Sequence, residues 1–233
     1  MVKSQKEEAS TAVAVKPSTA VGKSSAAEIA ELNLLMEQYV GAGKEGMEKI
    51  TLIPRTTILQ ALSPQCQRSK AEYDPAAKPG MIYEVGTKRL FTGAIHIVPV
   101  HWELVWVEWA PRETQQRGPV NQYRDESVVN EITKKDDRGR LVTKEGNTIV
   151  KSAQFYALNL DADLSRTFLP MQSTQFKKAR NWATEVMGEH MKTSDGTLRS
   201  APFFYRTYTL STVAESNPRG SWDGWKIDKG DPI

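Results

Sequence analysis

The stretch that decides the fold is TGAIHIVPVHWELVWVEWAPR, residues 92–112. Its β-branched and aromatic residues fit a pleated, half-buried surface, and it is too short and too charged to cross a membrane. Pro99 has no backbone N–H to donate to a strand ladder, so we expect an edge, a bulge or a corner there. The stretch therefore predicts two strand segments, 92–98 and 100–110.

Alternation along the second segment places large apolar groups on both of its faces, because successive side chains of a strand point to opposite sides. They divide into Trp102, Leu104 and Trp106 on one face, and Val105, Val107 and Trp109 on the other. Such a strand is either central and covered on both sides, or it uses one face to bind something flat.

Length and composition narrow the class of protein. The 233 residues suffice for one large domain or two small ones. The formal net charge of +3 is compatible with a polyanionic partner but does not require one. The single cysteine, Cys66, excludes an internal disulfide and a multi-cysteine zinc site and favours a reducing compartment. We find no apolar leader and no run of membrane-spanning length, so we expect a soluble intracellular protein without membrane contact.

The first 49 residues fall into two parts. Residues 1–23 lack large side chains and predict a disordered N-terminal tail. Within residues 24–49, Ser25 and Glu28 form a capping-box pattern that opens a helix, and glycines after it mark a stop.

We expect the remainder, residues 50–227, to be a single β-rich core domain, followed by a loose C-terminal tail at 228–233. Residues 111–151 carry nine Lys/Arg and seven Asp/Glu with few large apolar groups. This composition predicts a charged insertion, a long mobile loop with at most a small hairpin.

Periodicity and turn signals within the core predict a series of strands and one late helix. Besides the two segments above, the expected strands lie at 50–63 (interrupted at Pro54), 81–85, 88–91, 152–161, 166–171, 203–213 and 222–227. The helix begins at Ser173 or Thr174 and stops near 193–196, with Phe176, Ala179, Ala183, Val186 and Met187 as its buried stripe. The fold class is mainly β with one or two helices, an OB-like barrel or a twisted antiparallel sheet capped by a helix. The alternative is an irregular α+β fold.

Candidate metal and acid–base residues do not assemble into a site. His96, His101, Glu103 and Glu108 lie within thirteen residues, but they contain no i, i+4 ligand pair of a helix, and His190 stands alone on the predicted helix. No nucleophile motif is present. We therefore expect no metal, no cofactor and no enzymatic activity.

Aromatic residues interleaved with cations form the stronger pattern. Single-stranded nucleic acid is held in this way, with bases stacked on rings and phosphates contacted by Lys and Arg. From 166 to 206 there are seven basic residues against three acidic ones. The alternative is that the strand aromatics fill a core, which is the more common role for any one ring. The candidate nucleic-acid-binding residues are Trp106, Arg112, Lys151, Lys177, Lys178, Arg180, Tyr205, Arg206 and Tyr208.

The helix that follows Thr174 offers a specific version of this hypothesis. Lys177, Lys178 and Arg180 lie off its buried stripe in the first two turns. Because a helix N-terminus favours anions, phosphate there would meet backbone N–H groups and three cations together. The alternative is that these are ordinary solvated charges.

Three blocks resemble a family of tailed-phage proteins from replication and recombination gene neighbourhoods. They are IPRTTILQALSPQ at 53–65, MQSTQFKKARNW at 171–182 and YTLSTVAESNPRGSWDGWKI at 208–227, and the similarity spans about residues 30–227. The resemblance implies a phage DNA-metabolism protein that binds single-stranded DNA through an OB-like domain, in the host cytoplasm.

Together these observations predict a non-enzymatic single-stranded DNA-binding protein of a phage replication or recombination system. Its partners would be single-stranded DNA and replication or recombination proteins. The alternative, from another class, is a protein–protein interaction module that docks on a replication enzyme or a host factor.

Overall fold

The structure, a computed structural model, describes residues 51–233 except 112, 115–117 and 219. The expectations for the tail at 1–23 and the helix at 24–49 lie outside these residues. Residues 52–233 form one compact unit, which contains every helix and strand named below.

The described chain contains thirteen strands, two α-helices and three 3₁₀ turns. The strands are β1 (Arg55–Ile58), β2 (Ile82–Val85), β3 (Arg89–Phe91), β4 (Ile95–Trp109), β5 (Asn121–Tyr123), β6 (Thr133–Lys135), β7 (Leu141–Thr143), β8 (Thr148–Asn159), β9 (Ser165–Gln172), β10 (His190–Lys192), β11 (Leu198–Ser200), β12 (Arg206–Asn217) and β13 (Gly220–Pro232). The helices are α2 (Glu126–Ile132) and α3 (Phe176–Met187), and the 3₁₀ turns are η2 (Pro64–Cys66), η3 (Leu160–Ala162) and η4 (Ser173–Gln175).

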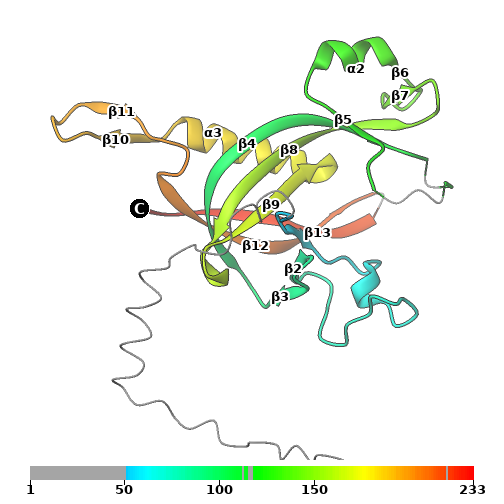
Figure 1. Ribbon diagram of the computed structural model, residues 1–233, viewed down its shortest axis with the longest axis horizontal. Coiled ribbons are helices and arrows are strands. Elements are labelled where there is room, and N and C mark those ends of the chain that lie inside the picture. The colour runs from blue at the N-terminus through cyan, green and yellow to red at the C-terminus, as the bar shows by residue number, and fades with distance from the viewer. Residues whose placement is uncertain (1–50, 112, 115–117, 219) are drawn as a thin grey trace, which may run out of the picture. The chain divides into compact units, whose positions relative to one another are not determined.

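Eleven of the strands form one sheet with the order β13-β12-β4-β8-β9-β1-β2-β3, and β5, β6 and β7 extend it beside β4 and β8. All pairs are antiparallel except β1–β9. The sheet curls into a half-barrel, and α3 lies along its concave side (Figure 1). The prediction of a mainly β fold with a twisted sheet capped by a helix is confirmed.

Strand β4 is an interior strand of this sheet, which is one of the two alternatives that the alternation of its residues leaves open. It pairs with β8 along almost its whole length, while its other edge pairs with β12 at Ile95–Ile97 and with β5 from Trp106. The register with β8 shifts between Pro99 and His101. Of the edge, bulge or corner expected at the proline, the structure therefore has a bulge, and the two predicted segments are one strand. Four consecutive residues, 105–108, are buried, so this end of the strand is covered on both faces.

Helix α3 fills the concave side with Trp182, which is 1% exposed. The indole stacks on Phe155 of β8 at 4.3 Å between ring centroids and meets Tyr208 of β12 edge-on at 5.3 Å. Ala179 and Val186 of the predicted stripe are buried, but Met187 is 79% exposed. The buried face of α3 therefore includes Trp182, which is not in the predicted stripe, and excludes Met187, which is. The helix also ends at Met187 instead of near 193–196, because residues 190–200 form the β10–β11 hairpin.

The segment expected to be a mobile loop, 111–151, contains α2 and the β6–β7 hairpin. Asp125 caps α2 by accepting a hydrogen bond from the Ser127 N–H at 2.8 Å. Val129 of α2 packs with Trp106 of β4 and Ile149 of β8 in a small core of its own. Composition alone missed this helix because the largest side chain of that core, Trp106, comes from β4, outside the charged stretch.

The outer edge of β13 is closed at two positions by side chains instead of by another strand. The Gln60 amide donates to the Asp223 carbonyl at 2.9 Å and accepts from the Asp223 N–H at 3.0 Å. Two residues on, the Trp225 N–H donates to Gln175 Oε1 at 2.9 Å, and Lys178 Nζ donates to the Trp225 carbonyl. These bonds tie the end of β1 and the start of α3 to β13.

The C-terminal residues expected to be loose belong to β13, which pairs with β12 as far as Pro232. An ion-pair network holds this end. The carboxylate of Glu189, which is 7% exposed, meets Arg206 Nη2 at 3.2 Å and Lys229 Nζ. Arg206 Nη1 also donates to the Gly230 carbonyl at 2.7 Å. The network joins the end of α3 to both β12 and β13 at the base of the β10–β11 hairpin.

Replacing Trp182 by Ala should destabilise the fold by about 3–5 kcal/mol, because it leaves a cavity between Phe155 and Tyr208. Chemical denaturation followed by far-UV circular dichroism measures the loss. Trp102→Ala is the matched control, since that tryptophan is 46% exposed and should cost far less. Equal losses for the two variants would contradict this packing.

The network around Glu189 predicts a pH-dependent stability. Hydrogen bonds from Lys229, and then from Arg206, hold the pKa of Glu189 below its ordinary value of 4.5. The resulting stabilisation is complete above that ordinary value and is lost as the pH falls through the lower pKa of the folded state. Glu189→Gln should therefore reduce stability by roughly 1–3 kcal/mol at pH 7, and the difference from the wild type should shrink below pH 4.5. The exposed Glu131→Gln, measured by the same urea titrations, should show neither effect.

Candidate nucleic-acid interface

An apolar cleft of about 220 Å³ lies between α3 and the β4–β8 part of the sheet. Its floor is made by Leu104 and Phe155, and its helix side by Phe176 and Ala183. Arg180 of α3 lines the same cleft and is exposed, and its guanidinium has no hydrogen-bond or ion-pair partner among the described residues. The cleft thus combines an apolar interior with a free cation.

Trp102 of β4 forms the outer wall of this cleft. It stands opposite Phe155 in the β4–β8 register, on the concave face. Between the pairing of β4 with β12 and its pairing with β5, the described strands leave this edge of β4 without a neighbour. The indole is therefore 46% exposed, whereas Phe155 is 1% exposed. A half-exposed indole over an apolar cleft is a surface on which a flat ring can stack.

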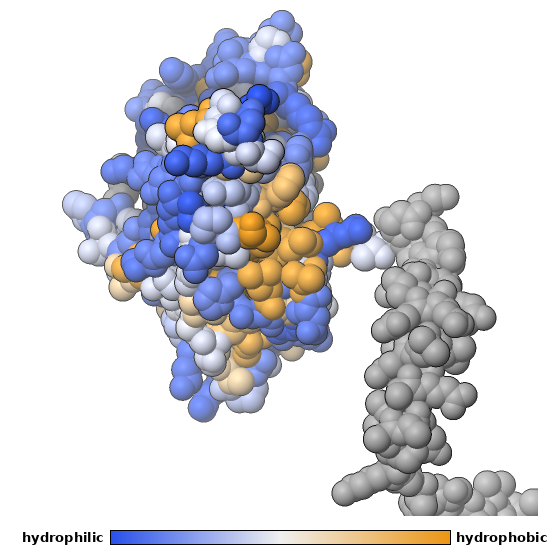
Figure 2. Space-filling view, turned by 90° about the vertical axis from the view of Figure 1, so that its left-hand side faces the viewer, coloured by the Kyte–Doolittle hydropathy of each residue, from blue (hydrophilic) through white to orange (hydrophobic). Residues whose placement is uncertain are grey.

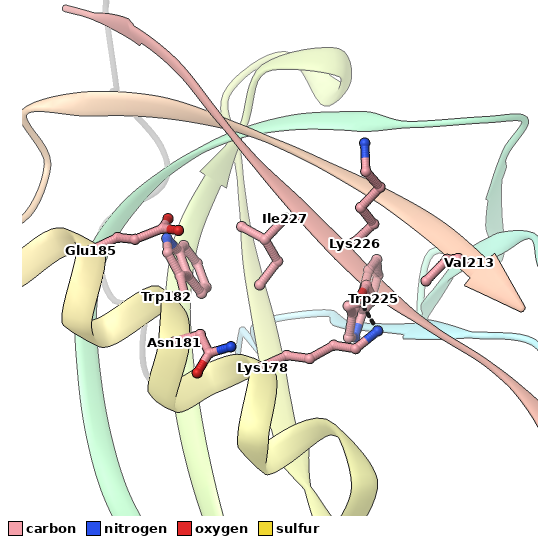
Figure 3. A pocket seen from close by; sticks show the side chains of 8 residues that line it. All are labelled: Lys178, Asn181, Trp182, Glu185, Val213, Trp225, Lys226 and Ile227. Atoms are coloured by element: carbon pink, nitrogen blue, oxygen red, sulfur yellow. Dashed lines mark hydrogen bonds between the residues drawn. The ribbon is translucent and has the colours of Figure 1, made fainter. Parts of the chain in front are cut away.

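The three cations predicted to act together at the start of α3 point in different directions. Arg180 faces the cleft, and Lys177 is exposed on the side away from the sheet. Lys178 reaches the opposite flank, where its Nζ meets Glu215 at 2.7 Å and the Trp225 carbonyl (Figure 3). The single phosphate site expected of all three cations at the helix N-terminus is not assembled, because the side chain of Lys178 leaves the helix about 100° away from that of Lys177 and about 200° away from that of Arg180.

The environment of Glu215 shows that Lys178 is already used within the protein. Burial would raise the pKa of this carboxyl, but hydrogen bonds from Lys178 and Trp222 outweigh it and hold the pKa below its usual range. Gly224 permits this contact, because a Cβ there would collide with the Glu215 carboxylate and the Lys178 ammonium.

Other predicted binding residues are buried or are already in contact with side chains of the protein itself. Trp106 is 6% and Tyr208 1% exposed, so neither ring is available to a base. Lys151 Nζ lies 4.9 Å from the centroid of the Trp106 ring and 3.8 Å from Glu126 Oε1. Arg206 is held by the Glu189 carboxylate, and its guanidinium also lies 5.6 Å from the centroid of the half-buried Tyr205 ring. Arg112 lies outside the described residues.

A second aromatic surface crosses the convex face of the sheet. His101 lies 5.6 Å from Tyr156, and Tyr156 lies 5.2 Å from Phe168, so the rings form a ladder over β4, β8 and β9. Its centre is occupied by Glu103, which accepts hydrogen bonds from Tyr156 and Arg124. Burial and the Glu103 hydrogen bond raise the pKa of Tyr156 to about 12. A carboxylate in this position disfavours phosphate, so we regard the ladder as the weaker nucleic-acid candidate.

The acid–base candidates are distributed over separate parts of the sheet. His96 Nδ1 pairs with Asp161 at 3.0 Å at the surface. Glu108 is buried and accepts hydrogen bonds from Tyr123 and Asn147, each at 2.6 Å. Among the described residues no group of three or more His, Cys, Asp or Glu side chains could hold a metal ion. In the same residues, no helix has both the length and the apolar character needed to span a membrane.

Trp106 is the predicted binding residue of its face, whereas the structure exposes Trp102 of the same face instead. The sequence does not show how far the strands that pair with β4 extend along it, and this decides which tryptophan is covered. Trp106 is covered by α2, whereas Trp102 lies beside the unpaired part of the edge. No pattern of neighbouring residues separates the two tryptophans, so sequence reasoning could not have found Trp102.

Exposed hydrophobic side chains also gather on one side of the molecule (Figure 2). Among the described residues, the exposed apolar side chains include Val100 at the bulge of β4, and Leu160 and Leu164 in the β8–β9 turn. Val100, Leu160 and Leu164 are aliphatic and offer no ring on which a base could stack, so we do not include them in the nucleic-acid interface.

Comparison with known proteins places the chain in a family. No curated protein and no solved structure is detectably similar to it. A family model described as Pam3 phage gp34-like protein matches residues 23–233, which includes the whole of the described unit. The chain therefore belongs to the Pam3 phage gp34-like protein family, and it is a phage protein.

Proposed function

We propose that this phage protein binds single-stranded DNA, without enzymatic activity, as part of phage DNA replication or recombination. The observation that carries the proposal is the half-exposed indole of Trp102 beside the guanidinium of Arg180, at the mouth of an apolar cleft. This guanidinium is unpaired within the part of the chain that the structure describes. Stacking on an aromatic ring together with phosphate contacts from Lys or Arg is how single strands are held without reading their sequence.

The proposed contact involves one base and the phosphate next to it. A base stacks on Trp102, and the adjacent phosphate meets Arg180, with Lys177 on the outer side of the same helix as the next cation. The exposed area of the indole supports a single-stranded partner, because bases in a duplex are already stacked on one another and present only their edges. The cleft volume of about 220 Å³ leaves room for one ring and not for a duplex.

Addition of oligo-dT should quench the tryptophan emission, and a duplex of the same length should do so much more weakly. Trp102→Ala should abolish most of the quenching and weaken binding by about 1–3 kcal/mol, the contribution of one stacked base. Trp102→Phe keeps a stacking surface and should retain most of the affinity, measured by anisotropy of labelled dT because its own emission is lost. Equal affinity for duplex and single strand would contradict the proposal.

The double variant Lys177→Gln/Arg180→Gln should bind every DNA sequence more weakly by a similar factor. Its plot of log affinity against log salt should lose about 0.7 in slope for each phosphate contact removed. The matched control is Lys134→Gln/Lys135→Gln, which removes the same charge from exposed residues of β6. If both double variants behave alike, only net charge matters and the cleft is not the binding site. Neither pair should change the melting temperature appreciably, because exposed substitutions stay within about 0.5 kcal/mol.

A further inference from the structure

The second flank of α3 faces the outer edge of β13, and this edge is closed at some positions and open at others. In an antiparallel strand the backbone groups of alternate residues point to the same edge. The outward groups of Asp223 are bonded by Gln60, and those of Trp225 by Gln175 and Lys178. The next outward position along β13 is therefore Ile227, which pairs with Leu210 in the same unbroken register as Trp225 with Thr212.

Among the described residues, the backbone of Ile227 has no hydrogen-bond partner on this side. In the part of the chain that the structure describes, its backbone N–H and C=O have no hydrogen bond outside the β12 ladder, and no strand lies beyond β13. Ile227 instead borders a cavity of about 280 Å³ between β13 and α3. Asn181, Trp182 and Glu185 line the helix side of this cavity (Figure 3). An open strand edge beside a helix with a cavity between them is a geometry into which an extended peptide adds as a further strand.

We propose that this groove binds an extended peptide segment of a partner protein, which adds to β13 at Ile227 and carries a basic residue facing Glu185. The proposal goes beyond DNA binding and does not depend on it, since it concerns the opposite flank of α3.

Charge determines the kind of partner. Two lysines line the groove, but each is paired: Lys178 with Glu215 at 2.7 Å, and Lys226 with Asp228 at 2.7 Å. Glu185 is exposed, and its carboxylate has no ion-pair or hydrogen-bond partner among the described residues. The uncompensated charge of the groove is thus negative, which favours a basic peptide and disfavours the phosphates of a nucleic acid.

The length of the open edge limits the segment that can bind. On one side the Lys178 and Gln175 side chains occupy the edge at Trp225. On the other side Arg206 bonds the Gly230 carbonyl, and Lys229 is drawn to Glu189. At about 3.3 Å per residue, the window between them accepts an extended segment of about three residues. Such a short addition is typical of the end of a chain or the tip of a loop.

Panning of a random heptapeptide library on the full-length protein tests the proposal. We expect the enriched peptides to contain a Lys or Arg. The Glu185→Lys variant should bind them at least tenfold more weakly than the wild type, whereas the matched control Glu131→Lys on α2 should bind them only slightly more weakly. The proposal would be overturned if the wild-type protein enriched no peptides beyond those that the immobilised Glu185→Lys variant enriches, or if the two variants bound the peptides equally well. Both glutamates are exposed, so folding is retained and is checked by circular dichroism.

Amide hydrogen exchange locates the bound peptide. In the free protein the Ile227 N–H should exchange faster than that of Trp225, and the best enriched peptide should slow Ile227 by at least tenfold. Slowing at other amides with no change at Ile227 would overturn strand addition at this edge. So would protection of Ile227 by oligo-dT, or self-association through this edge in sedimentation experiments, because each assigns the groove to another occupant.

Discussion

Trp182 is the side chain on which the rest of the structure depends. Its indole lies against Phe155 of β8 and Tyr208 of β12, two strands separated in the sheet by β4, so it spans the curvature of the half-barrel. Burial of so large a ring requires the sheet to curl around α3 and fixes how the helix is rotated about its axis. The rotation decides which cations face the cleft, the solvent or the edge of β13.

Because α3 divides the concave side, the molecule has two flanks with different chemistry. One flank has an apolar cleft with a half-exposed tryptophan and with an arginine that has no ion-pair partner among residues 51–233 as described. The other has a carboxylate and a strand edge that are likewise without partners in those residues, and lysines that are already paired. If both proposals hold, the DNA and the basic peptide would contact different flanks of α3 and would not share binding residues. A protein that holds DNA on one flank and a replication partner on the other would combine both functions predicted for this chain.

In the described part of the chain, side chains and not a further strand cover the outer edge of β13. They cover it at Asp223 and Trp225, whereas the next part of the edge remains open among these residues. Gln60 and Gln175 each offer an amide that imitates a backbone group, and each satisfies one position on β13. Amide side chains are short, so they seal the edge only where β1 and the start of α3 come close. Beyond Trp225 a cavity separates the helix from the strand, and the backbone of Ile227 stays available. Exposed edges of this kind are either protected or used for binding.

Sequence alone determined the elements whose signal is local. Alternation predicted a strand with large apolar groups on both faces, Pro99 predicted an interruption that the structure resolves as a bulge, and apolar spacing predicted most of α3. It could not decide which ring of a face is covered, because Trp102 and Trp106 have similar neighbours in sequence and differ only in where β12, β5 and α2 lie. Nor could it foresee α2, the extent of β13 or the pairing of Lys178 and Arg206. These depend on residues tens of positions away, brought together by strand register and by the burial of Trp182, which only the tertiary structure decides.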